Sequence, residues 1–160
     1  MKLQLGRLEV KWGVIFSLMT ILWMIAEKML GWHDEHIDQH ENMTNFVAIP
    51  AILVYILALI EKRKSLGGLI SWKEGFFSGL GISIIVAVLA PLVQLLVYYV
   101  ISPGYFQTVI EYAVSEHGKN REEMEAYFTI QSYLWQSALG AIFIGAITSA
   151  LVALFVKKKA

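Results

Sequence analysis

The sequence predicts an all-α membrane protein with four transmembrane helices, and three observations support that prediction. Hydrophobic residues make up 57% and charged residues 16% of the 160 residues, whereas soluble domains average ~45–50% and ~25%. Four apolar stretches are long enough to cross a hydrocarbon core of ~30 Å, which takes about 20 helical residues. Their apolar residues form continuous runs, without the polar stripe that a soluble amphipathic helix presents to water. This composition excludes a disordered chain, a coiled coil and a nucleic-acid-binding module.

Residues 1–160 are predicted to form a single integral membrane domain with both termini in the cytoplasm. We expect the spans at about 12–30, 45–60, 76–101 and 131–156. Basic residues collect on the cytoplasmic side of membrane proteins. In a four-span chain, ten of the thirteen basic residues share one side, namely Lys2, Arg7, Lys11, Lys62, Arg63, Lys64, Lys73, Lys157, Lys158 and Lys159.

The extracytoplasmic connection, at about 103–130, is predicted to be helical. Apolar residues recur at helical spacing from Phe106 to Val114, and His117-Gly118 is a typical helix end. This first helix is expected to lie on the membrane surface. Asn120 followed by Glu123 forms a variant of the capping box that starts a second helix. We expect this second helix to continue without a break into the fourth span.

The connection between the first two spans contains a dense group of histidines and carboxylates. In a helix, His33, His36 and His40 would lie along one face, with Asp34 and Glu35 beside them. Imidazole nitrogens suit zinc, copper or nickel, and nearby carboxylates complete or orient the ligand shell. These five residues therefore form a candidate site for a transition metal such as zinc. The alternatives are a solvated connector between two spans and a histidine pH sensor.

Polar side chains also occur inside the outer half of the predicted spans. Glu27, Asn45, Gln94 and Gln136 come from four different spans and lie at comparable depth. Polar groups in a bilayer cost free energy unless they are paired or wetted, and an ionisable one is a functional candidate. These residues predict a shallow polar pocket that opens outward. In the alternative interpretation, Glu27 snorkels to the interface and the amides hold helices together.

Small residues recur every four positions in the third and fourth predicted spans. Such stripes let two helices approach closely. They predict tight packing between these spans, within one subunit or across a homodimer. The residues are Gly79, Ser83 and Ala87 in the third span and Ala141, Gly145 and Ser149 in the fourth.

Six stretches of the chain together are similar to one family. They are K-W-G-V-I-F-S (11–17), E-K-M-L-G-W-H-D-E-H-I (27–37), A-I-P-A-I-L-V-Y-I-L-A-L (48–59), W-K-E-G-F-F-S-G (72–79), A-P-L-V-Q (90–94) and E-A-Y-F (125–128). In this order, over nearly the whole chain, they resemble the DUF4199 family of small membrane proteins, found mainly in Bacteroidota. The resemblance implies a multi-pass protein of the bacterial inner membrane and carries over no catalytic residue.

The sequence leaves three classes of function open. The small-residue stripes favour a non-enzymatic scaffold or accessory subunit, whose partners would be the lipid bilayer and a homodimer or larger membrane complex. The alternative is a small transport or binding protein that uses the polar pocket or the metal site. A membrane enzyme ranks last, because no nucleophile–base pair or metal-hydrolase spacing is present. Acidic and basic residues number 13 each, so no excess charge points to nucleic acid.

Overall fold

The computed structural model describes residues 5–158, and its four longest elements are all helices. Four helical segments are long and apolar enough to cross a membrane, which confirms the prediction of a multi-pass membrane protein. Lys2 and Lys159, which the charge argument used, lie outside the described residues. The four segments are α1 (Arg7–Met29), α2–η1–α3 (Ile37–Met43, Thr44–Val47, Ala48–Ser65), α4 with η2 (Trp72–Leu96, Val97–Ile101) and α7 (Ile130–Val156).

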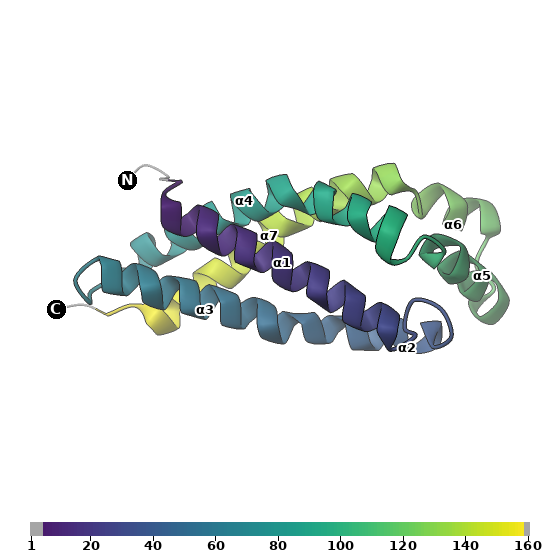
Figure 1. The fold of residues 1–160 in the computed structure, drawn as a ribbon, viewed down its shortest axis with the longest axis horizontal. Helices are drawn as coiled ribbons and strands as arrows, with labels where there is room; N and C mark the ends of the chain where they lie inside the picture. The colour runs from purple at the N-terminus through teal and green to yellow at the C-terminus, as the bar shows by residue number, and fades with distance from the viewer. Residues whose placement is uncertain (1–4, 159–160) are drawn as a thin grey trace.

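The bundle is elongated, and its two ends differ in structure. Both chain ends and the connection between α3 and α4 lie at one end, which we call the terminal end (Figure 1). The short helices α2, α5 (Tyr105–His117) and α6 (Arg121–Tyr127) lie at the opposite end, which we call the cap end. The cap end carries the histidines and most of the acidic residues.

Three of the four segments begin earlier than expected, and in two of them, α1 and α4, polar caps mark the start. At the start of α1, the Glu9 carboxylate accepts the backbone N–H of Gly6 at 3.0 Å. At the start of α4, the Ser71 hydroxyl accepts the N–H of Glu74 at 3.2 Å, and the Glu74 carboxylate accepts the N–H of Ser71 at 2.8 Å. The spans expected from 12 and from 76 therefore begin at Arg7 and Trp72. Hydropathy locates the apolar part of a helix, whereas capping determines where it starts.

The cap-end connection agrees with the prediction in its first part and differs in its second. Helix α5 ends at His117, with Gly118 in the left-handed conformation (φ +60°) that favours glycine. The Asn120 side chain accepts the N–H of Glu123 at 3.1 Å and starts α6. The expected continuous helix into the fourth span is wrong, however. Thr129 starts α7 as a separate helix by accepting the N–H of Ser132 at 3.2 Å.

Helices α4 and α7 pack against each other through their small residues. A Cβ atom on Gly79 would overlap Ser149, and one on Gly145 would overlap Ser83. Both serines are fully buried, and each hydroxyl donates to the carbonyl oxygen four residues earlier in its own helix. Both stripes therefore lie in one contact within a single chain. In the same two stripes, Ala87 is also buried and Ala141 is half-buried.

We predict that Gly145→Ala destabilises the protein, whereas Gly140→Ala on the same helix does not. The added methyl group at position 145 would meet Ser83 and the Tyr55 hydroxyl, while a Cβ at position 140 has no neighbour within 4 Å. Overpacking of this kind costs about 1–3 kcal/mol. Unfolding of both variants in the same detergent micelles measures the difference. Equal stability of the two variants would contradict the close contact of α4 with α7.

Candidate metal centre at the cap end

The candidate site forms where the chain turns back over the end of α1. Gly31 has a φ of +76°, a conformation that suits glycine and few other residues. The turn is closed by backbone hydrogen bonds from His36 N–H to the Gly31 carbonyl oxygen (2.7 Å) and from Trp32 N–H to the Glu27 carbonyl oxygen (3.0 Å). This geometry places His33 against the last turn of α1, where Glu27 lies.

Glu27 is the central residue of the cluster, and its side chain is completely buried. One carboxylate oxygen accepts a hydrogen bond from the Trp23 indole N–H at 2.5 Å. The other lies 3.0 Å from Nε2 of His33 and 4.0 Å from Nδ1 of His40. The His33 side chain is 1% exposed and that of His40, from α2, is 16% exposed. One carboxylate and two imidazoles thus meet in a site shielded from solvent.

Tyr105, the first residue of α5, completes the cluster. Its hydroxyl oxygen lies 2.9 Å from Nε2 of His40. The rings of His33, His40 and Tyr105 lie 5.1–5.3 Å from one another, centroid to centroid. Burial raises the pKa of Tyr105 to about 12, so its hydroxyl stays neutral at physiological pH. The contact holds the His40 ring with Nδ1 turned toward Glu27.

The donor atoms lie close enough together to form a candidate metal site. A carboxylate oxygen of Glu27 and one nitrogen each from His33 and His40 all lie within 4.8 Å of one another. Zinc binds such donors at ~2.0–2.2 Å, which places two ligands of one ion about 3–4 Å apart. The Nδ1 atoms of His33 and His40 are buried and have no hydrogen-bond partner among residues 5–158. A buried nitrogen without a partner costs free energy that a bound cation would recover.

The structure brings together only part of the predicted metal set. Residues 31–36 form turns, so the three histidines share no helical face. His36 and Glu35 are exposed, and Asp34 pairs with Lys28 at the surface. That hydrogen bond from the Lys28 ammonium holds the pKa of the Asp34 carboxyl below its usual value. Glu27, predicted as part of a separate pocket, takes the place of these three residues.

The structure likewise brings together only part of the residue set predicted for the polar pocket. Asn45, Gln94 and Gln136 line a cavity of about 560 Å³ between the four spans, whereas Glu27 lies outside its lining. Thr44, four residues after His40 in the chain, also lines the cavity. The cavity lining therefore begins about one helical turn from the carboxylate–histidine cluster.

Sequence reasoning missed two residues of this site and one buried carboxylate elsewhere in the bundle. Neither Trp23 nor Tyr105 stands out in the sequence, and only the folded chain places them against Glu27 and His40. The third is Glu9, which is 1% exposed and is held by the Ser78 hydroxyl (2.7 Å) and the Lys62 ammonium (3.0 Å). A signal for Glu9 did exist in the sequence. Glu9 and Glu27 are five helical turns apart and so share one face of α1.

Fold and site together define a four-helix, multi-pass membrane protein that buries a carboxylate–imidazole cluster at one end. The chain belongs to the DUF4199 family, described as a protein of unknown function, whose profile matches residues 11–158. This match confirms the resemblance noted from the sequence. No curated protein and no solved structure matches the chain.

We predict that His33→Ala destabilises the fold by roughly 3–5 kcal/mol, because it leaves the buried Glu27 carboxylate without its imidazole partner at 3.0 Å. His36→Ala, at an exposed position in the same turn, is the matched control and is expected to change stability by less than about 0.5 kcal/mol. Adding Glu27→Gln to His33→Ala removes the unpaired charge and is expected to restore part of the loss. If the stability losses of His33→Ala and Glu27→Gln simply added in the double variant, His33 and Glu27 would not interact.

Proposed function

We propose that this protein is a metal-binding protein of the bacterial inner membrane. It holds a divalent transition metal ion such as zinc at the cap end, through Glu27, His33 and His40. One observation carries the proposal: a carboxylate oxygen and two imidazole nitrogens from three chain segments are buried within 4.8 Å of one another. Two histidines and a carboxylate are a common donor set for zinc and for non-haem iron.

The contacts around the three donors support this proposal. Residues that hold a ligand in the correct orientation strengthen a metal site, usually through the ligand atom that the metal does not use. The Trp23 indole N–H holds the second carboxylate oxygen of Glu27, and Tyr105 holds the second nitrogen of His40. Three protein ligands leave one position of a tetrahedral zinc site open. An open position suits an ion that is exchanged, or that binds a small solute, better than a purely structural ion.

The distribution of charge supports an outward-facing site. Among the described residues, the terminal end carries eight basic side chains, and basic residues favour the cytoplasmic side. The cap end would then face outward, with both termini in the cytoplasm. Its acidic surface attracts cations and raises their local concentration around the site. The acidic residues are Asp34, Glu35, Asp38, Glu41, Glu111, Glu116, Glu122, Glu123 and Glu125.

The alternative function is a scaffold or accessory subunit, and its support came from the small-residue stripes. Gly79 packs against Ser149 and Gly145 against Ser83 within one chain, so these stripes contribute to the subunit's own fold. They therefore do not favour a homodimer. A metal-binding function also accounts for the buried Glu27, which a scaffold does not require.

Metal content tests the proposal directly. Mass spectrometry of detergent-purified protein, loaded with zinc and then dialysed, is expected to find one ion per chain. Because His33 and His40 would be ligands, the double variant His33→Ala/His40→Ala is expected to lose the ion. The controls are His36→Ala and His117→Ala, which alter exposed cap-end histidines outside the cluster and are expected to retain it. Metal-free wild-type protein, or equal loss in the control variants, would refute the proposed site.

We predict that Tyr105→Phe weakens zinc binding without abolishing it. The change removes the hydroxyl that orients His40 and leaves all three ligands in place. Losing such a supporting contact typically costs 10–100-fold in affinity. Competition against a chromophoric chelator measures the effect. Tyr112→Phe, on the same helix and outside the cluster, is the control. Unchanged affinity in Tyr105→Phe would show that Tyr105 does not support the metal.

A further inference from the structure

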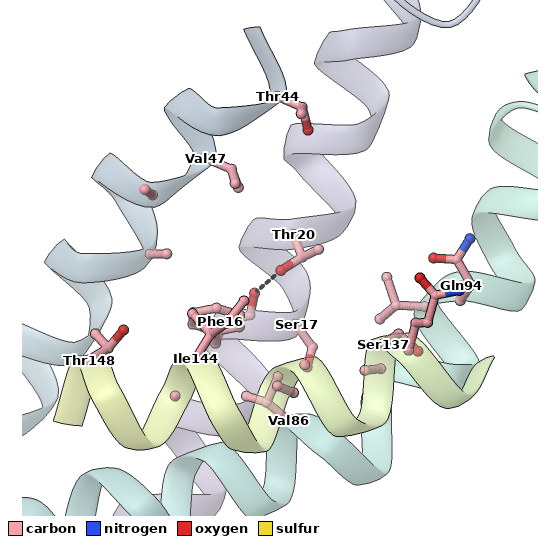
Figure 2. A pocket seen from close by; sticks show the side chains of 18 of the residues that line it. Phe16, Ser17, Thr20, Thr44, Val47, Val86, Gln94, Ser137, Ile144 and Thr148 are labelled. Atoms are coloured by element: carbon pink, nitrogen blue, oxygen red, sulfur yellow. Dashed lines mark hydrogen bonds between the residues drawn. The ribbon is translucent and has the colours of Figure 1, made fainter. Parts of the chain in front are cut away.

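A long cavity lies between the four spans, beside the metal site. Its volume of about 560 Å³ falls in the range of sites for small organic molecules, roughly 300–1,000 Å³. On α7 the lining extends from Gln136 to Thr148, which corresponds to about 18 Å at 1.5 Å per helical residue. Figure 2 shows Gln94 and Ser137 on one side of the cavity and Thr148 on the other. The cavity is therefore shaped for an extended molecule.

The lining is electrically neutral. Its walls combine aliphatic side chains and two aromatic ones, Phe16 and Tyr55, with polar groups that are all hydroxyls or amides. None of the described lining residues is a lysine, arginine, histidine, aspartate or glutamate. Placing a charged group in such surroundings, with no partner of opposite sign, costs several kcal/mol. The lining therefore selects for an uncharged occupant.

The amide groups gather at the cap end of the cavity. Gln94 lies seven residues before the end of its span at Ile101, about 10 Å along the helix. Within the described chain, no protein group hydrogen-bonds its half-buried side chain. Gln136 accepts a hydrogen bond from the Tyr127 hydroxyl at 3.2 Å and keeps its own N–H groups available. Two amides can thus donate to a carbonyl or hydroxyl oxygen at this end.

The cavity also opens sideways toward the bilayer. Ile144 lines it and is 68% exposed, so the described chain does not close the cavity at this position. In the membrane, that part of α7 faces hydrocarbon. A molecule already dissolved in the bilayer therefore reaches the cavity directly, whereas a water-soluble solute must first cross apolar surroundings.

From these features we infer that the cavity binds one neutral amphiphile taken from the membrane. Its apolar chain lies along α7, and its carbonyl or hydroxyl head group accepts hydrogen bonds from Gln94 and Gln136. The inference rests on the cavity alone and holds whether or not Glu27, His33 and His40 bind a metal.

Two probes of equal chain length test the inference. The protein is placed in lipid nanodiscs that contain either dodecan-1-ol or dodecanoate, and bound molecules are counted by native mass spectrometry. Because the lining is neutral, we expect one bound dodecanol per chain and at least tenfold weaker binding of dodecanoate. Equal binding of both probes, or no bound dodecanol, would overturn the inference.

Variants distinguish the cavity from ordinary lipid contact. Gly140→Leu fills the cavity from a position where an added Cβ meets no atom within 4 Å, so the fold is expected to persist and dodecanol binding to be lost. Leu139→Phe adds bulk at the adjacent position, which is 51% exposed and outside the lining, and is expected to bind as the wild type does. Gln94→Leu keeps the side chain's bulk and is expected to bind roughly tenfold more weakly. Retained binding in Gly140→Leu, or loss in Leu139→Phe, would contradict the assignment.

The zinc content of the same variants separates this inference from the proposed function. Gly140, Leu139 and Gln94 lie outside the metal cluster, so all three variants are expected to keep the zinc content of the wild type. Loss of dodecanol binding in a protein that retains its zinc would show that the cavity can be blocked while the metal site stays intact. If Gly140→Leu lost both zinc and dodecanol, its fold would be disrupted. The test would then rest on Gln94→Leu, which is expected to bind dodecanol roughly tenfold more weakly than the wild type.

Discussion

Helix α1 carries two buried carboxylates on one face, and burial removes both of them from water. Each must be satisfied inside the protein, because an unpaired charge at this depth is costly. At the terminal end, Glu9 is held by Lys62 from α3 and Ser78 from α4. At the cap end, Glu27 is surrounded by Trp23 from its own helix and by His33 and His40. The two carboxylates thus tie α1 to the rest of the bundle at both of its ends.

The cavity lies between the two ends of α1 that Glu9 and Glu27 hold in place, and it arises from how the other helices pack. Glycine contacts bring α4 and α7 together, with Gly79 and Gly145 against opposing serines. Where α1 and α3 face this pair, small residues such as Ser17 and Ala51 stand beside the larger Phe16 and Tyr55. Small side chains cannot fill the gap between helices that polar contacts hold at their ends. The cavity is therefore a consequence of the same polar and small residues that assemble the bundle.

Sequence reasoning was reliable where structure depends on local pattern. The four spans follow from apolar length, and the end of α5 follows from Gly118. It failed where tertiary contacts or a turn decide. His33 reaches Glu27 only because Gly31 reverses the chain, and His40 meets Tyr105 across 65 residues. Hydropathy also could not show that Thr129 separates α6 from α7. The new helix start depends on a single hydrogen bond, from the Ser132 N–H to the Thr129 hydroxyl, which average hydropathy does not detect.

One short segment connects the two proposed binding sites. Thr44 lines the cavity and lies one helical turn after His40. This segment, η1, is a 3₁₀ stretch between α2 and α3, and such tightened turns inside longer helices often mark a hinge. A movement of η1 that widens the cavity would also shift His40 relative to Glu27. Two ligands that act on one such element alter each other's affinity by the same factor, because coupling between binding sites is reciprocal. The carboxylate that anchors α1 would in this way link an ion at the membrane surface to a molecule held between the spans.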